Sequence, residues 1–198
     1  MIIPTREQSL GWLSWAEELN PGPWTGHVRS AARAAEAIAG PCGMNAEAAW
    51  HMGLLHDIGY YNGRSNLKHA VLGYDFLMER GYPDLARICL THSFSSGAAT
   101  EYSGTYDIDQ TEIELIKAAL PHVNDYDRLI QLCDAICVPE GVCLMEKRLM
   151  DVAIRHGSPP PGIVKKWKAY FDIKAQFEAM LGHSIYRLFD DAIKNTFE

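Results

Sequence analysis

Apolar residues recur at the helical spacing of three and four residues along almost the whole chain, and the two-residue alternation of β-strands is nearly absent. This spacing predicts helices near residues 5–18, 25–39, 45–57, 66–80, 83–92, 110–120, 124–138, 141–156, 162–181 and 184–195. The pattern therefore predicts an all-α fold. Because 198 residues suffice for one sizeable hydrophobic core, we expect one domain rather than two.

Two irregular segments interrupt the helical pattern. Residues 93–110 are polar, rich in Gly, Ser, Thr and Tyr, and too long for a simple connection, and loops of this kind often act as lids or binding loops. The segment GSPPPG at 157–162 prevents a helix from continuing and sets off a C-terminal pair of aromatic-rich helices. We expect these helices to pack back on the domain rather than form a separate tail domain.

Charge and cysteine content exclude several classes of protein. A net charge of −7 argues against a nucleic-acid polymer as partner, although a bound metal could still attract a small anion. We expect neither a membrane span nor a signal peptide, because no apolar run reaches about 18 residues and the N-terminus lacks an apolar core. The five cysteines are scattered, with no CxxC pair, so we interpret them as reduced core residues of a cytoplasmic protein without a cysteine-ligated zinc.

Asp134 is the polar residue whose sequence surroundings least suit a charge. In RLIQLCDAICV (128–138) almost every neighbour is apolar, so we expect this carboxylate to lie deep in the core. A buried carboxylate needs a partner or a raised pKa, and a metal ion is an efficient partner.

Several histidines lie at the ends of apolar helical stripes. His27 opens one stripe, His69 opens a second, and His92 closes a third. His56 and Asp57 are adjacent, so both can reach one ion only near a helix terminus, which the following Gly59 supplies. Imidazole and carboxylate ligands without thiolate suit Fe, Mn, Co, Ni, Zn or Mg.

The remaining polar candidates have weaker patterns. Arg64 and Lys68 lie between the His-Asp pair and His69, where a cation could bind a substrate phosphate. His51 lies about 140° around the helix from His56 and should face elsewhere. We interpret three other histidines and one charged helical face as structural or solvent-exposed: His122, His156, His183, and Glu146, Lys147, Arg148 and Asp151.

The order His27, His56-Asp57, Asp134 resembles the H…HD…D signature of the HD-domain superfamily of metal-dependent phosphohydrolases. The string HDIG at 56–59 recurs in that superfamily, and residues 69–92 resemble its next segment, where many members carry two more histidines. The resemblance covers residues 25–140 and implies a metal-binding core there, with residues 141–198 as a C-terminal helical extension of a single domain.

The resemblance also implies the ligands of one or two divalent ions. His27, His56, Asp57 and Asp134 would hold the first ion, and His69 and His92 the second, with Asp57 bridging both. His56 and Asp57 would form the catalytic pair. Many relatives carry a charged residue three positions after the HD aspartate, but this chain has Tyr60 there, so we assign no general acid.

Three functions are compatible with this ligand set. The first is hydrolysis of a small phosphate ester, with a nucleotide or cyclic nucleotide favoured, by metal-activated water. The second is a mixed-valent di-iron oxygenase acting on a small polar substrate, as some HD-type proteins are. The third is a non-catalytic nucleotide-binding sensor. The expected partner is a small phosphorylated molecule, and a homo-oligomer is left open.

Overall fold

A computed structural model describes residues 1–99, 106–156 and 163–197. Its α-helices are α1 (Arg6–Leu19), α2 (Trp24–Ala39), α3 (Ala46–Leu55), α4 (Lys68–Met78), α5 (Pro83–Thr91), α6 (Gln110–Ala119), α7 (Asp125–Ile136), α8 (Met145–His156), α9 (Ile163–Leu181) and α10 (Ala192–Phe197). Short 3₁₀ helices are η1 (Ile58–Asn62), η3 (Leu120–His122) and η4 (Ile185–Leu188), and two short strands are β1 (Cys137–Val138) and β2 (Gly141–Val142). The all-α fold predicted from the sequence is confirmed.

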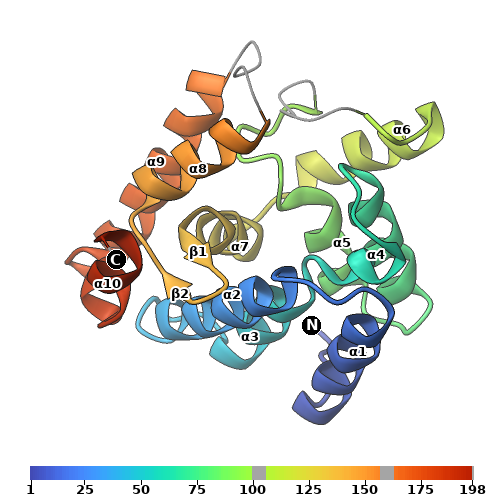
Figure 1. The fold of residues 1–198 in the computed structure, drawn as a ribbon, viewed down its shortest axis with the longest axis horizontal. Coiled ribbons are helices and arrows are strands. Elements are labelled where there is room, and N and C mark those ends of the chain that lie inside the picture. Colours follow the sequence, from blue (N-terminus) through green and yellow to red (C-terminus); the bar gives the residue numbers. More distant parts are fainter. Residues whose placement is uncertain (100–105, 157–162, 198) are drawn as a thin grey trace.

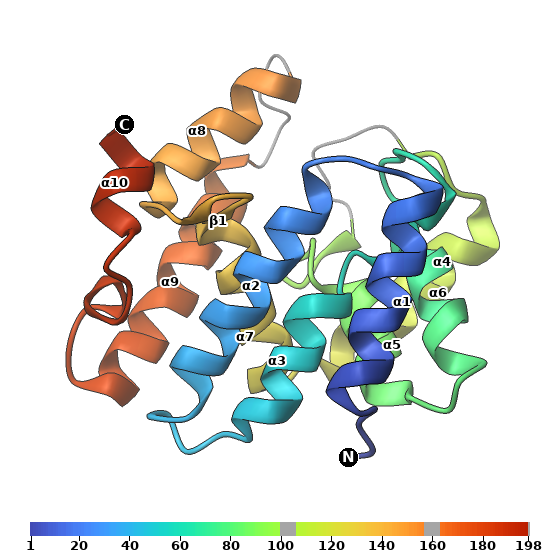
Figure 2. The same cartoon turned by 60° about the horizontal axis from the view of Figure 1, so that its bottom comes forward.

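Helix α7 lies in the middle of the molecule and Figure 1 looks nearly along it. Helices α2 and α3 pack on one side of it, α8 to α10 lie on a second side, and α4 to α6 lie on a third. One hydrophobic core joins residues of α2 and α7 to Tyr170, Ile173 and Phe177 of α9. The C-terminal helices therefore pack against the rest of the chain, as Figure 2 also shows.

Helices α2 and α3 approach closely because small residues line their interface. Ala31, Ala32 and Ala35 of α2 are fully buried. A Cβ on Gly53 of α3 would lie only 2.7 Å from the Cα of Ala32, so no larger residue fits there without moving a helix. This contact fixes the C-terminal end of α3, which carries His56, against α2, which carries His27.

The sequence pattern is wrong in two places near the C-terminus. The helix predicted over 141–156 begins only at Met145, because the chain first forms an antiparallel hairpin in which Val138 pairs with Gly141. Pro139 disfavours helical backbone at Val138, and Gly141 has a φ of +148°, a conformation that favours glycine. The helix predicted over 184–195 is divided into η4 and α10, because Phe189 adopts an extended conformation between them.

The irregular segment 93–110 is partly packed where it is described. Phe94 and Ala99 are buried in a second, smaller apolar cluster. The Asp107 carboxylate accepts hydrogen bonds from the backbone N–H groups of Asn66, Leu67 and Lys68 and so caps the start of α4. Residues 100–105 lie outside the described residues, so the lid function predicted for this segment stays a prediction.

Over the described ranges, each helix is too short or too polar to cross a lipid bilayer.

Candidate metal centre

Helix ends deliver imidazoles and carboxylates to one place in the molecule. The contributing residues are His27 in the first turn of α2, His56 and Asp57 after α3, His69 at the start of α4, His92 after α5, and Asp134 in the last turn of α7. All of them except Asp134 are buried. The six residues that the sequence predicts as metal ligands therefore come from five helices and converge on one site.

Asp57 lies at the centre of this cluster. Its Oδ2 is 3.5 Å from His56 Nε2, whereas its Oδ1 is 3.2 Å from His69 Nε2 and 3.4 Å from His92 Nε2. The two oxygens therefore face different histidines. Two groups of donor atoms, each with all members within 4.8 Å of one another, could hold metal: His27, His56 and Asp57, and Asp57, His69 and His92.

The orientation of the histidines follows from local backbone structure. His56 and His92 each follow the last residue of a helix, and their Nδ1 atoms donate to the carbonyl oxygens three residues earlier, Gly53 and Cys89, at 2.8 Å. These carbonyls belong to helix ends that lack a further intrahelical donor. Because a carbonyl only accepts, Nδ1 carries the proton and Nε2 keeps its lone pair.

His27 follows the same rule from a different element. Its Nδ1 donates to the carbonyl oxygen of Cys137 in β1 at 3.2 Å, and its Nε2 lies 3.0 Å from Asp134 Oδ1. Buried Nε2 atoms of His27 and His56, and Oδ1 of Asp57, lack a hydrogen-bond partner. Buried polar atoms without partners are costly. A divalent cation coordinated by the two imidazole nitrogens and the carboxylate oxygen would satisfy all three atoms, so the site fits a metal.

The electrostatics keep these side chains in the protonation states that bind metal. Burial alone would raise the pKa of Asp57, but the surrounding His56, His69 and His92 hold it well below its ordinary value. Burial lowers the pKa of His92 to about 4, although Asp57 opposes that shift. At neutral pH the carboxylate is therefore ionised and His92 is neutral, as metal ligation requires.

Asp134 corrects one prediction. It does not lie deep in the core, because 23% of its side chain is exposed. Its neighbours Cys133 and Ile136 are fully buried, but on a helix adjacent residues project about 100° apart, so Asp134 points into the site instead. Although burial raises the pKa of Asp134, the nearby His27, His56 and His92 together lower it below the ordinary value.

Gly59 and Tyr60 bring η1 against α4. A Cβ on Gly59 would lie 1.9 Å from the carbonyl oxygen of His69, so this approach requires glycine. The ring of Tyr60 stacks on the ring of His69, with centroids 4.2 Å apart and planes inclined by 14°. Tyr60 therefore packs against a predicted ligand of the second ion, a contact that the sequence pattern alone did not indicate.

A pocket of about 430 Å³ opens onto the cluster, with His27 and Asp57 in its wall. Arg64 lines it together with Ser65 and Asn66, and Trp24 with neighbouring prolines forms an apolar part. Arg64 thus lies where the sequence placed a phosphate-binding cation. Lys68 is instead ion-paired with Glu112 of α6, a partner distant in sequence.

The remaining histidines lie elsewhere among the described residues. His51 is fully buried, and its Nδ1 lies 2.8 Å from Ser9 Oγ, which joins α3 to α1. His122 is exposed and His183 is half-buried, away from the cluster. The side chain of His156 lies outside the described residues.

Comparison with known proteins agrees with this arrangement. The HD domain family model matches residues 24–137, a stretch that holds all six predicted ligands. No curated protein matches the chain. Among solved structures, the chain is similar to the HD domain of L. monocytogenes phosphodiesterase PgpH in complex with cyclic-di-AMP, with 17% identity, a TM-score of 0.47, and coverage of 91% of this chain and 97% of that one.

A second structure of the PgpH HD domain, whose description names no ligand, is also similar to the chain. The identity is 17%, the TM-score is 0.44, and the match covers 92% of this chain and 90% of that one. The family match extends over more than half of the chain and includes His27, the His56-Asp57 pair and Asp134. The chain belongs to the HD domain family.

Proposed function

We propose that this protein is a metal-dependent phosphohydrolase that cleaves a small phosphate ester. The observation that carries the proposal is Asp57, whose two oxygens face two separate groups of histidine Nε2 atoms. A carboxylate shared in this way is typical of sites in which two cations lie about 3.5–4 Å apart.

The proposed ligands divide between two ions. His27, His56, Asp57 and Asp134 would hold the first, and Asp57, His69 and His92 the second. When bound, divalent cations such as Fe, Mn, Co, Ni, Zn or Mg supply Lewis acidity and a water molecule of lowered pKa.

The chain itself holds and shields this centre. The Nδ1 hydrogen bonds of His27, His56 and His92 to carbonyl oxygens fix the rings with Nε2 directed inward. Asp57 stays ionised and is nearly closed off from solvent, so its charge is weakly screened. Arg64 would bind the phosphate oxygens at the pocket, where a guanidinium can make two parallel hydrogen bonds.

The pocket also bears on the substrate. Trp24, Pro21 and Pro139 offer an apolar surface in the same pocket as Arg64. A phosphate ester with a flat organic group, such as a nucleotide or cyclic nucleotide, matches this combination. We also propose that residues 1–198 act as a single domain. One hydrophobic core includes residues of the first helix, α1, and of the last helix, α10.

The test is hydrolysis by the full chain loaded in turn with each divalent metal. The substrates are nucleoside phosphates, cyclic nucleotides and a chromogenic phosphate monoester. We expect Asp57→Asn to lower kcat/KM by at least about 100-fold. Asp172→Asn is the matched control, since that carboxylate is exposed and pairs only locally with Lys168.

Failure of every metal-loaded form to release phosphate from this panel would contradict the proposal. Product formation that requires both iron and O₂, with a mixed-valent EPR signal, would indicate the oxygenase alternative. Saturable nucleotide binding without turnover under any metal would indicate a sensor.

A further inference from the structure

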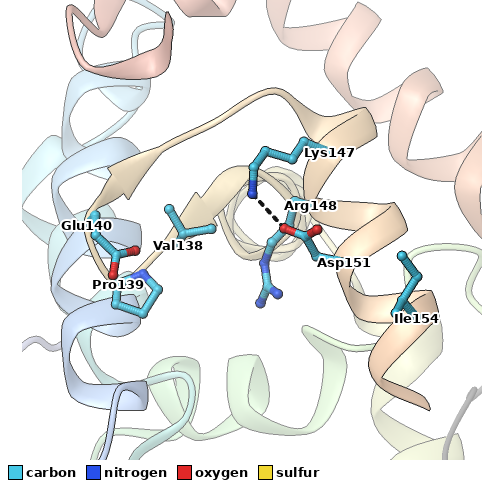
Figure 3. Close-up of a pocket in the computed structure, with 7 residues that line it drawn as sticks. All are labelled: Val138, Pro139, Glu140, Lys147, Arg148, Asp151 and Ile154. Carbon is cyan, nitrogen blue, oxygen red and sulfur yellow. Dashed lines mark hydrogen bonds and ion pairs between the residues drawn. The ribbon is translucent and has the colours of Figure 1, made fainter. Parts of the chain in front are cut away.

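Arg148 of α8 lies beyond the part of the chain matched by the family model. It lines a second pocket of about 430 Å³ whose other lining residues are Val138, Pro139, Glu140, Lys147, Asp151 and Ile154. Figure 3 shows its guanidinium directed into the open space, away from the neighbouring Lys147–Asp151 pair. The sequence predicts a structural role for the charged face of α8. Lys147 and Asp151 of this face pair along the helix, whereas Arg148 points inward.

The guanidinium of Arg148 has an unsatisfied donor. Its Nε is buried and has no hydrogen-bond partner. Lys147 Nζ lies 2.7 Å from Asp151 Oδ2, so the nearest carboxylate on the helix pairs with a different cation. Glu140 and Asp151 are the carboxylates of this pocket, and among the residues drawn in Figure 3 only Lys147 and Asp151 are joined by an ion pair. An inward cation without an anion is costly unless a ligand supplies one.

The residues that line the two pockets place Arg148 near the metal centre. Val152, one turn later on α8, lines the metal-centre pocket with His27 and Asp57, and Pro139 lines both pockets. On a helix, residues four apart share a face, so Arg148 and Val152 approach the same region. The second pocket therefore adjoins the first at Pro139.

The charge of Arg148 also acts on two groups at the His27–Asp134 end of the cluster. The first is Tyr170 of α9, where burial raises the pKa of the phenol, the Asp134 carboxylate raises it further, and the Arg148 guanidinium opposes both. The second is Cys137, whose thiol also experiences the charge of Arg148 and whose carbonyl oxygen accepts the His27 hydrogen bond. The charge of Arg148 thus acts on Tyr170 together with the charge of Asp134, and on Cys137, whose carbonyl oxygen holds His27.

We propose that Arg148 binds a phosphate group of the substrate, so that the C-terminal extension completes the substrate site. The ligand class is a phosphate oxyanion, which matches a guanidinium through two parallel hydrogen bonds. This inference rests on the proposed function of the same site. The chain has a net charge of −7, so an anion binds only where positive charge is concentrated locally. Arg148 and Arg64 would supply that charge beside the metal centre.

The test is titration of the full chain with inorganic phosphate by calorimetry, with and without Mg²⁺. We expect saturable binding to the wild type and affinity weakened about 10- to 100-fold in Arg148→Gln. Arg148→Lys should lose part of that affinity, because an ammonium keeps the charge but not the paired donors. Lys117→Gln removes one positive charge from α6, where Lys117 is exposed and pairs locally with Glu114, and should change the affinity by less than about twofold.

Circular dichroism and bound-metal content should match the wild type in Arg148→Gln. Unchanged phosphate affinity in Arg148→Gln, an equal loss in Lys117→Gln, loss of bound metal in Arg148→Gln, or no saturable phosphate binding to the wild type would each overturn the inference. Phosphate binding that depends on Arg148 in a protein that hydrolyses no ester would refute the proposed hydrolase while supporting the binding role of Arg148.

Discussion

Replacing Gly59 with alanine should push η1 away from α4. Because the clash is with backbone atoms, the substitution should also displace the ligands of the metal centre. The added Cβ would lie 1.9 Å from the carbonyl oxygen of His69 and 2.6 Å from the backbone nitrogen of Gly73. Ordinary contacts begin near 3.4 Å, so the two backbone segments must move apart by about 1.5 Å. Both obstructing atoms belong to the backbone, so no side-chain rotation relieves the clash.

The expected cost of this substitution has two parts. Forcing an extra carbon into a packed interface costs about 3 kcal/mol at the upper end of the usual range, which lowers the Tm of a chain of this size by roughly 6–12 °C. Asp57 Oδ1 and His69 Nε2 now lie 3.2 Å apart. Metal–ligand bonds of about 2.0–2.2 Å do not tolerate a displacement of about 1.5 Å, so metal binding by Asp57, His69 and His92 should be lost.

Thermal unfolding of the metal-free protein followed by circular dichroism measures the first effect, and elemental analysis of the metal-loaded protein measures the second. Gly11→Ala in α1 is the matched control, because a Cβ there would meet no atom within 4 Å. It should raise stability by about 0.5–1 kcal/mol through helix propensity. A Gly59→Ala protein with wild-type Tm and wild-type metal content would refute this reasoning.

Three further outcomes follow from the structure. His69→Ala or His92→Ala should remove one bound ion and keep the other, as measured by elemental analysis, and loss of all metal from either variant would contradict the proposed division of ligands. Adding a divalent metal at about 100 times its Kd should stabilise the chelator-treated protein by about 2.7 kcal/mol, a rise in Tm of roughly 5–11 °C, and an unchanged Tm would argue against a metal site. Burial lowers the pKa of His51 below its ordinary 6.5 despite the opposing Glu47, so the unfolded chain takes up the proton first and the wild type loses stability as the pH falls below about 6.5. Urea unfolding at pH 7.5 and 5.5 should show a smaller loss on acidification for His51→Gln, and an equal loss in both proteins would exclude this role for His51.

The sequence by itself determined the helices and the identity of the proposed ligands. Helical spacing is a local property, and the core-facing stripes that predicted α2, α4 and α5 are buried in the structure. His27, His69 and His92 were found because each is a polar residue at the end of such a stripe. The adjacent His56 and Asp57 were found because they follow an apolar helix and precede a glycine.

Tertiary structure decided which of these groups meet and which charges remain for a ligand. Lys68 pairs with Glu112, which is 44 residues away, whereas Arg148 is directed into a pocket and its neighbour Lys147 pairs with Asp151. Neither outcome can be derived from periodicity, because periodicity specifies the face of a helix and not what packs against that face. The same limit explains Asp134, which looked fully buried among apolar neighbours. Its partial exposure depends on how distant segments pack around it, and only that packing brings both oxygens of Asp57 within reach of three histidines.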